Sequence, residues 1–362
     1  MIDQKLMRFE EKAVFTLRSL YRKYGYLPYK MSKFEEYELY IRNKDFLVSD
    51  RVISFNDTNG KLMALKPDVT LSIIKGGEDR AGEKQRVFYN ENVYRVSEST
   101  HRFKEIMQTG LECIGDIDIY DIYEVISLAA QSLATICDDF YIEISNMDVV
   151  CSVLSGVCGN KEFVNAAIKC ISQKNKHDLK TVCNEFSVDE NGYRKISNLI
   201  SLYGERSAVI ESIKEICEPT LVDIMIKLSN LLRKSEFGDR IKFDFSAVND
   251  MNYYNGFVFK GFVSGIFCDV LSGGQYDNMM KRMKRKSSAV GFALYLDRMD
   301  DLNCKEVSYD VDYVLIYDEL TDFMKLSSKV KEFIDSGFSV STQKTVPANL
   351  RYKNILYLNK EG

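Results

Sequence analysis

The sequence is poor in the residues that build metal sites and disulfides. It contains only two histidines, His101 and His177, so we expect no histidine-based metal site. Its nine cysteines, an odd number, are scattered from Cys113 to Cys304 without a C-x-x-C pair. This usage is typical of a reducing compartment, so we expect a cytoplasmic protein whose thiols serve as small apolar fillers.

Long apolar runs and a large charge of one sign are also missing. The chain has no run of about 18 apolar residues, so we expect no membrane span and no membrane partner. The amino-terminal stretch "MIDQKLMRFEEKAVF" is amphipathic and unlike a signal peptide. The net charge of −4 and the pI near 5.6 give no general electrostatic reason to bind nucleic acid, which leaves only a local basic groove open.

The composition that is present, 45% apolar and 28% charged residues, is ordinary for a soluble globular protein. Residues 5–24 carry apolar side chains at three- and four-residue spacing, which predicts an amphipathic helix. Asn59-Gly60 between two short apolar runs predicts a hairpin. Residues 85–99 and 103–115 are predicted as two further strands, and residues 121–137 as a long helix.

The character of the chain changes in its second half. From about residue 147 to 236 the apolar periodicity is helical, which predicts a helical block inserted between strand-rich segments. The patterns that follow predict strands at 241–248, 256–263 and 265–274, then a helix at 289–302.

The last residues, 311–362, have the pattern strand, helix, strand, strand. We therefore predict an α+β fold with a mixed or antiparallel sheet flanked by helices. The predicted domains are a core of residues 1–310, which carries the helical insertion, and a short α/β segment of residues 311–362.

The stretch "LKPDVT" is the first candidate for a binding site. Pro67 favours an extended backbone, after which Asp68 could bind an ammonium group and Thr70 could donate a hydrogen bond beside it. The alternative is that Asp68 only caps a helix that starts here.

A second candidate lies on the predicted strand pair. Arg95 stands near one strand end, with Arg102 and Lys104 across the loop, and Gln108 and Glu112 share one face of the returning strand. Cations on the loop with an amide and a carboxylate on the sheet would suit a zwitterionic or phosphate-bearing ligand. The alternative is a solvated hairpin without a ligand.

Three stretches follow in the second half. "NDMNYYNGFVF" presents Tyr253 and Tyr254 before a strand, "LSGGQYDNM" pairs two glycines ahead of Tyr276, and Arg298 is predicted on a helix. The glycines permit either close backbone approach to a ligand or a tight turn. A lone arginine on a helix, like the charge run "KRMKRK", is usually a solvated surface feature.

Taken together and in this order, the stretches resemble the catalytic core of histidyl-tRNA synthetases, a class II aminoacyl-tRNA synthetase fold. The family motif R-P-E-G-T resembles "KPDVT", the arginine of F-R-x-E falls on Arg95, and Q-x-G-x-E falls on Gln108 to Glu112. G-G-R-Y-D falls on Gly273 to Asp277, and A-V-G-F-A-x-G-x-E-R falls on Ala289 to Arg298. The resemblance implies a six-stranded antiparallel sheet and dimerisation through the first helix and strand.

Departures from the family pattern fall on residues that take part in the reaction of the synthetases. The family signature R-G-L-D-Y-Y-N-x-T-V-F is matched by "NDMNYYNGFVF", so Asn249 stands where the synthetases have an arginine. Losing one preorganised donor to a developing oxyanion costs roughly 10²–10³ in rate. The glutamate of F-R-x-E is replaced by Ser97. The stretch 311–362 is near or below the size at which a domain stabilises its own core, which argues against a tRNA-binding domain.

The sequence therefore resembles the regulatory subunits of short-form ATP phosphoribosyltransferase, which share this core and catalyse no reaction. The resemblance implies a subunit that activates a separate catalytic subunit at the first step of histidine biosynthesis and mediates histidine feedback. It implies a hetero-oligomer that also self-associates as a dimer, with no tRNA and no cofactor. The alternatives are a divergent histidyl-tRNA synthetase and another class II paralogue that activates an amino acid.

The resemblance also implies which residues meet the ligand. The residues expected to bind histidine are Asp68, Thr70, Arg95, Gln108, Glu112, Tyr253, Tyr254 and Tyr276. Further anion or nucleotide contacts are expected from Arg102, Lys104 and Arg298.

Overall fold

The fold is taken from a computed structural model, which describes residues 7–44, 52–80, 82–96, 100–248, 253–303 and 309–358. The chain divides into two compact units, Met1–Asp300 and Asp301–Gly362. In the described ranges, no helix is both long and apolar enough to cross a membrane. The same ranges hold no cluster of three or more histidine, cysteine, aspartate or glutamate side chains suited to a metal ion.

The first unit is built on a nine-stranded sheet of order β1-β5-β6-β12-β11-β10-β7-β9-β8. Its six central strands are antiparallel: β5 (Gln85–Val96), β6 (Phe103–Gly115), β12 (Ser288–Tyr295), β11 (Leu271–Gln275), β10 (Asn255–Val263) and β7 (Phe140–Asn146). The outer strands are β1 (Leu27–Pro28), parallel to β5, β9 (Ile241–Asp244), parallel to β7, and β8 (Tyr203–Gly204). The predicted six-stranded antiparallel sheet is confirmed, with three strands added at its edges.

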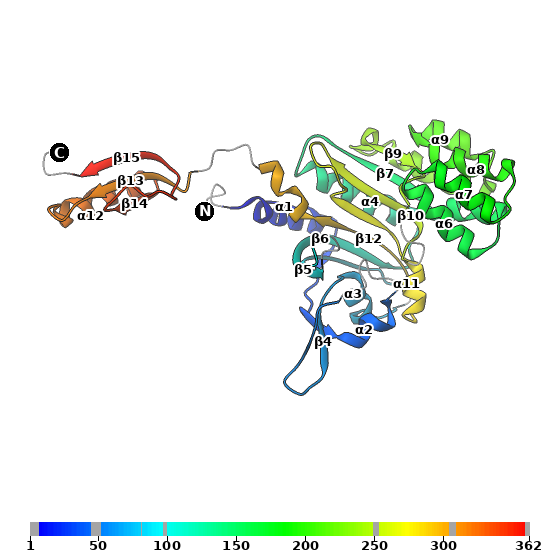
Figure 1. Ribbon diagram of the computed structural model, residues 1–362, viewed down its shortest axis with the longest axis horizontal. Coiled ribbons are helices and arrows are strands. Elements are labelled where there is room, and N and C mark those ends of the chain that lie inside the picture. Colours follow the sequence, from blue (N-terminus) through cyan, green and yellow to red (C-terminus); the bar gives the residue numbers. More distant parts are fainter. Residues whose placement is uncertain are drawn as a thin grey trace. The chain divides into compact units, whose positions relative to one another are not determined.

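Two helices cover one face of this sheet, α1 (Phe9–Lys23) and α4 (Ile119–Ala134) (Figure 1). The helix predicted at 5–24 is confirmed as α1, whose Leu17 and Tyr21 are fully buried. The Tyr21 hydroxyl lies 3.0 Å from the Ser132 hydroxyl, which joins α1 to α4. Asp118 caps α4, since its carboxylate accepts the first backbone N–H groups of the helix.

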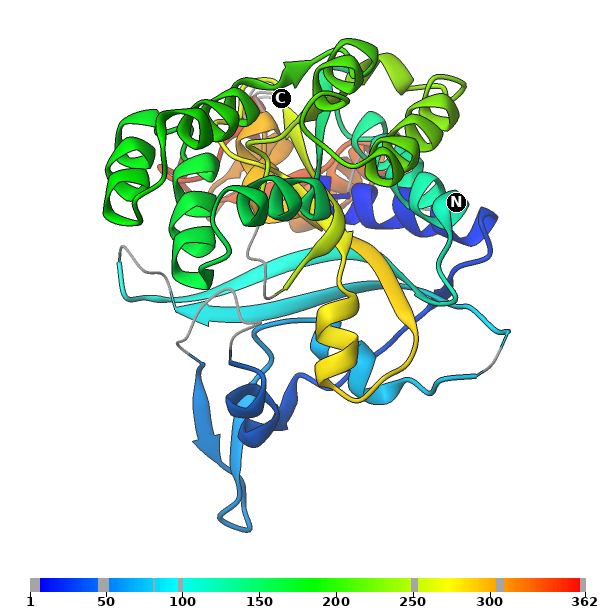
Figure 2. The ribbon, with the colours of Figure 1, turned by 90° about the vertical axis from the view of Figure 1, so that its right-hand side faces the viewer.

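The opposite face carries smaller elements that form the floor of the candidate site. They are α2 (Tyr37–Arg42), α3 (Thr70–Gly76), α11 (Asp277–Arg282) and a sheet of β2 (Phe34–Glu36), β4 (Leu62–Leu65) and β3 (Ser54–Asn56). The hairpin predicted at Asn59-Gly60 is confirmed, and Gly60 has the positive φ of 78° that such a turn requires. Figure 2 shows the long hairpin β5–β6 crossing the unit between this small sheet and a group of helices.

Those helices lie between β7 and β9 in the chain. They are α5 (Met147–Val157), α6 (Lys161–Ser172), α7 (Lys176–Glu185), α8 (Glu190–Ser201), α9 (Arg206–Ile213), α10 (Pro219–Leu232) and the short 3-10 helix η3 (Gly238–Arg240). Asn146, Asn160, Asn175 and Asp189 cap α5 to α8 with their side-chain oxygens. The helical periodicity seen in the sequence is therefore confirmed, and only the two-residue strand β8 interrupts it.

The helix predicted at 289–302 is wrong. The segment forms the central strand β12 and then the 3-10 helix η4 (Leu296–Asn303). An unbroken apolar run fits a strand buried on both faces as well as a buried helix, so periodicity could not separate the two. The strand predicted at 265–274 begins only at Leu271, and Gly273 and Gly274 lie within β11 and not in a turn.

The second unit is a parallel sheet of order β14-β13-β15 with one helix. Its elements are β13 (Val311–Tyr317), α12 (Phe323–Asp335), β14 (Val340–Gln343) and β15 (Tyr352–Leu358), which confirms the predicted order of elements. Tyr313 packs its ring on Phe333 at 4.3 Å between centroids, so α12 covers one face of the sheet.

Candidate functional site

A buried carboxylate, Glu112, is the centre of the candidate site. The side chain is 2% exposed. Thr70 Oγ1 donates to Glu112 Oε1 at 2.9 Å, and the Tyr276 hydroxyl donates to Oε2 at 2.7 Å. Burial raises the pKa of Glu112 to about 8, against the two hydroxyl hydrogen bonds, which lower it. In the part of the chain that the structure describes, no lysine or arginine forms an ion pair with Glu112.

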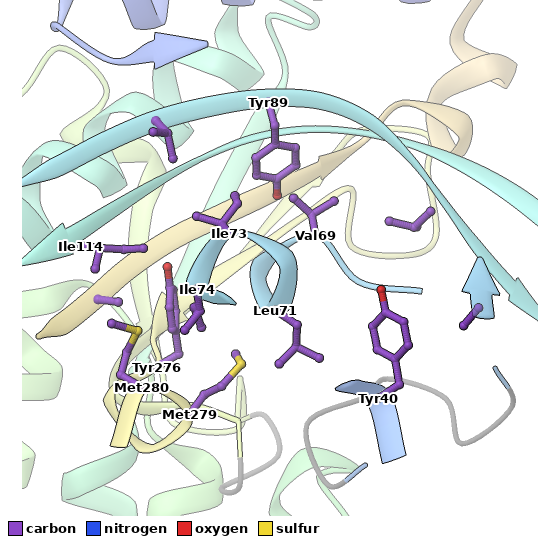
Figure 3. Packing of buried hydrophobic residues seen from close by; sticks show 14 residues of the cluster. Tyr40, Val69, Leu71, Ile73, Ile74, Tyr89, Ile114, Tyr276, Met279 and Met280 are labelled. Atoms are coloured by element: carbon purple, nitrogen blue, oxygen red, sulfur yellow. The ribbon is translucent and has the colours of Figure 1, made fainter. Parts of the chain in front are cut away.

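The sheet and its glycines place this carboxylate. Gln108, Gly110 and Glu112 share one face of β6, and Glu112 lies directly opposite Gly291 on β12. A Cβ atom at Gly291 would overlap the Glu112 carboxylate, so only glycine leaves room for it. Tyr276 follows β11, and Figure 3 shows its hydroxyl pointing toward the strands of the sheet while Met279 and Met280 lie near its ring.

Asp68 lies beside this carboxylate, one residue before the N-cap Val69 of α3, and its side chain bonds to the first turn of that helix. Its Oδ1 accepts the Leu71 backbone N–H at 2.9 Å, which is the capping role given above as the alternative. Burial raises the pKa of Asp68, although the Leu71 hydrogen bond and the nearby charge of Arg95 both lower it. Arg95 Nε donates to the Pro67 carbonyl at 3.0 Å, so the arginine holds the same loop.

Tyrosine rings form a wall next to the two acids. The ring centroids of Tyr253 and Tyr254 are 4.4 Å apart, and Tyr253 lies 6.4 Å from Tyr276. Burial raises the pKa of Tyr253 and Tyr254 well above the ordinary value, and the charges of Asp68 and Glu112 raise it further. The phenols are therefore neutral at physiological pH and offer flat apolar faces with hydroxyl tips.

The other predicted residues lie in different surroundings. Gln108 is buried on β6, at 3% exposure. Arg298, on η4, is bound to Asp269 at 2.9 Å. Arg102 and Lys104 are exposed at the far end of the hairpin from Glu112, so the structure does not bring them to the carboxylate.

Two departures from the family pattern lie outside the described residues. They are Asn249, which stands in the place of the family arginine, and Ser97. The loss of catalytic activity that these two replacements imply therefore remains a prediction from the sequence.

Lys66 is a buried residue next to the site that the sequence patterns did not reveal, because a lysine beside a proline is normally a surface residue. Its side chain is fully buried, and Nζ lies 2.9 Å from Glu91 Oε2 on β5. Burial lowers the pKa of Lys66, and the Glu91 hydrogen bond raises it. Its backbone N–H donates to the Lys33 carbonyl at 3.0 Å, so Lys66 anchors the loop that carries Asp68 and Thr70.

We predict that Lys66→Met lowers the free energy of unfolding by about 2 kcal/mol, because it leaves the Glu91 carboxylate without a partner. The figure is set below that for a fully buried pair because Glu91 is 15% exposed. Urea unfolding is the measurement. Lys66→Met/Glu91→Gln should regain part of the loss, and equal losses in the single and double variants would contradict the pairing.

Comparison with known proteins places this geometry in a family. A profile of the histidyl-tRNA synthetase family matches residues 3–299. The chain belongs to the histidyl-tRNA synthetase family. Within it, the chain is similar to the ATP phosphoribosyltransferase regulatory subunit of Oceanobacillus iheyensis, with 28% identity over 76% of this chain and 69% of that relative. Regulatory subunits of the same name match from several further organisms, among them Clostridium acetobutylicum at 25% identity. The resemblance stated from the sequence is confirmed.

Solved structures of this family share the fold. An ATP phosphoribosyltransferase regulatory subunit/histidyl-tRNA synthetase from Bacillus halodurans aligns with a TM-score of 0.77 and 22% identity, covering 99% of this chain and 96% of that one. A chain of the ATP phosphoribosyl transferase (HisG:HisZ) complex from Thermotoga maritima aligns with a TM-score of 0.62 and 18% identity, covering 80% and 97%. The predicted α+β, class II synthetase-like core is confirmed.

Proposed function

We propose that this member of the histidyl-tRNA synthetase family is a non-catalytic regulatory subunit of ATP phosphoribosyltransferase. In this role it binds a separate short-form catalytic subunit, activates it at the first step of histidine biosynthesis, and carries the histidine feedback. The names of its curated relatives support the role, as does the likeness to a chain of a solved transferase complex. The proposal includes a dimer of this chain, no tRNA, and a cytoplasmic location.

The observation that carries the ligand assignment is the buried carboxyl of Glu112, which has no cation partner among the described residues. A buried carboxylate without a cation partner is poised to accept a cation from a ligand. Free histidine brings an α-ammonium and an imidazole, and both can meet Glu112 and Asp68. The neutral rings of Tyr253 and Tyr254 suit the flat imidazole.

The remaining residues complete the proposed contacts. Thr70 and Tyr276 orient the Glu112 carboxylate through their hydroxyls. Arg95 and Gln108 address the ligand carboxylate or a nearby anion. Arg102 and Lys104 lie too far along the hairpin to join them, so we assign these two no contact with histidine.

Feedback requires that histidine binds one quaternary state better than another, typically with a coupling of about 1–3 kcal/mol. We expect the chain to co-purify with a short phosphoribosyltransferase subunit and to raise its activity, and histidine to reverse that gain. Enzyme assays with and without this chain measure the first effect, and titration calorimetry of the complex with histidine measures the second. If the catalytic subunit were fully active alone and never bound this chain, the regulatory role would be contradicted. If calorimetry detected no binding at millimolar histidine, the sensor role would be contradicted.

A histidyl-tRNA synthetase is the second candidate, because the family profile and the similar Bacillus halodurans protein both carry that name. Such an enzyme makes histidyl-adenylate reversibly. Histidine-dependent exchange of pyrophosphate into ATP by the purified chain would establish the synthetase. We expect no exchange above a no-histidine control.

A further inference from the structure

A groove, the α10 groove, lies between the start of α4 and α10. It consists of two hollows of about 260 Å³ and about 520 Å³, and Ile119 and Lys227 line both, so the hollows are continuous. Gln275 of β11 also lines it, and the neighbouring Gly274 lies in the same row of the sheet as Glu112. Because successive residues of a strand face opposite sides of a sheet, the groove lies on the side away from Glu112.

One end of the α10 groove is apolar. Its apolar side chains come from the start of α4 and from α10, and they are Ile117, Ile119, Ile122, Leu221 and Ile224. Ile224 is 40% exposed, so apolar surface reaches the rim. The two hollows together follow α10 from Leu221 to Leu231, roughly 15 Å at the rise of an α-helix. This length suits a segment of another protein better than a small metabolite.

The other end of the α10 groove is basic. Lys227, Arg233 and Lys234 line it, and no acidic residue does. Within the described ranges, the side chains of these three residues form no ion pair and no hydrogen bond. Their charges are therefore open to carboxylates of a bound segment.

Two aspartates line the apolar end, and both are engaged by backbone groups. Asp118 accepts the N–H groups of Tyr120 and Asp121 and so caps α4. Asp148, near the start of α5, accepts the Gly256 N–H at 3.4 Å. A segment in the groove thus meets an apolar end whose acids are occupied and a basic end whose cations are open.

The wall of the groove is continuous with the segments that carry tyrosines of the candidate site. Gly256 and Phe257 line the groove and closely follow Tyr254, while Gln275 directly precedes Tyr276. Gln275 Oε1 accepts the Phe257 N–H at 2.8 Å, which ties the two segments together. A Cβ atom at Gly256 would overlap the same oxygen, so the contact is closely packed. A molecule in the groove therefore touches the backbone that positions these tyrosines.

We propose that the α10 groove is the docking site for a segment of the catalytic subunit that carries apolar side chains followed by carboxylates. The apolar side chains fill the end at Ile117 and Leu221, and the carboxylates meet Lys227, Arg233 and Lys234. The inference rests on the proposed function, because it takes the transferase subunit as the partner. Contact between the partner and the wall that carries the tyrosines is what a coupling between histidine and the partner requires.

The test is the affinity of the full-length chain for the catalytic subunit of the same organism, measured by calorimetric titration. Lys227→Glu/Arg233→Glu/Lys234→Glu should weaken binding at least tenfold, because the reversed charges repel the carboxylates of the segment. The affinity of the wild-type chain should fall as NaCl is raised, and that of the triple variant much less. Ile224→Ser removes an exposed apolar side chain from the other end and should weaken binding about threefold or more.

A charge reversal outside the groove provides the matched control. Lys161→Glu/Lys169→Glu/Lys195→Glu reverses three exposed cations on α6 and α8, none of which lines the groove. Its net charge equals that of the groove variant, and it should bind the catalytic subunit within about threefold of wild type, because exposed charges far from the partner are screened.

The outcomes separate the groove from the proposed function. If the wild-type chain does not bind the catalytic subunit, the proposed function fails and the docking site with it. If the wild-type chain binds and the groove variants bind equally well with cooperative thermal unfolding, only the docking site fails. It also fails if the control variant loses as much affinity as the groove variant. Finally, if the groove variant alone dissociates the dimer of this chain in sedimentation without the catalytic subunit, a second copy occupies the groove and the inference is overturned.

Discussion

Glu112→Gln should weaken histidine binding roughly 10- to 100-fold at pH 8, the loss expected when a ligand cation keeps its hydrogen bond and loses the opposite charge. Glutamine has the shape of glutamate, so one of the Thr70 and Tyr276 hydroxyls can still donate to its amide oxygen while the other accepts from its NH2 group. The variant therefore changes the charge at the centre of the pocket with little change in packing. Calorimetric titration of the complex with histidine measures the loss.

The same residue sets a pH dependence. Burial raises the pKa of Glu112 to about 8, so at pH 7 the empty pocket mostly holds the protonated acid. Binding an ammonium group then requires that the proton leave. Histidine affinity of the wild type should rise with pH, by about fivefold from pH 7 to 8 and by about tenfold in all, and level off above the pKa. The slope should vanish in Glu112→Gln.

Stability should change in the opposite direction. Between the ordinary value of 4.5 and about 8, folded Glu112 holds a proton that the unfolded chain releases. The folded state then binds more protons than the unfolded state, so the free energy of unfolding falls as pH rises through this window. Glu112→Gln has no carboxyl to titrate, so its free energy of unfolding should not show this fall with pH. Without ligand, the variant should be more stable than wild type at pH 8, by a margin that shrinks toward pH 5.

A matched carboxylate outside the pocket provides the control. Glu143 lies on β7 of the same sheet, and burial raises its pKa too. Glu143→Gln should leave histidine affinity within about threefold of wild type, because an exposed or half-buried substitution away from the ligand has a small effect. If wild type and Glu112→Gln bound histidine with equal affinity, Glu112 would not contact the ligand.

Much of this site could be placed from the sequence because its residues sit on regular elements. The strand predicted at 103–115 matches β6 residue for residue, so Gln108 and Glu112 were correctly placed on one face. Alternation along a strand has a fixed period of two, which makes such a prediction robust once the strand is recognised. Thr70, Tyr276 and Glu112 come together as the linked motifs implied.

The predictions that were wrong concern segments whose structure depends on packing against distant parts of the chain, which the local sequence pattern does not show. The run from Ala289 packs against α4 and against α11, so it has no polar side to reveal a strand. Gly273 and Gly274 looked like a turn, but a Cβ atom on either would press on Phe259 or Tyr254. Their role depends on side chains that come from another strand and its preceding loop.

The contacts of Asp68 and Tyr295 could not be predicted from the local sequence pattern. The sequence allowed Asp68 to be a ligand contact or a helix cap; its Oδ1 accepts the Leu71 N–H at the start of α3, and the ligand contact stays a prediction. Tyr295 did not stand out within a run of apolar residues. Its neighbours are known only from the structure, which places the Arg298 guanidinium over its ring and pairs it with Gln108 of β6. Only the register of β12 against β6 brings these side chains together.

Gly291→Ala should lower the free energy of unfolding by about 3 kcal/mol or more, at the upper end for overpacking a core. The added Cβ would overlap Glu112 Oε2 and would lie 2.5 Å from the Leu111 carbonyl oxygen and 2.6 Å from the Glu112 carboxyl carbon. Gly291 is paired on both sides, with Glu112 of β6 and Gly274 of β11, so the strand cannot move away from either. Urea unfolding gives the loss, and histidine titration should show binding weakened as well.

Gly156→Ala gives the matched control, because the same methyl group is added where space is open. Gly156 is exposed on α5, and no atom lies within 4 Å of a Cβ added there. Replacing a glycine inside a helix by alanine stabilises by roughly 0.5–1 kcal/mol, so this variant should be equal to or more stable than wild type. If Gly291→Ala were as stable as Gly156→Ala, the Glu112 carboxylate would have to lie elsewhere. The hydrogen bonds that Thr70 and Tyr276 donate to this carboxylate would then not exist as described.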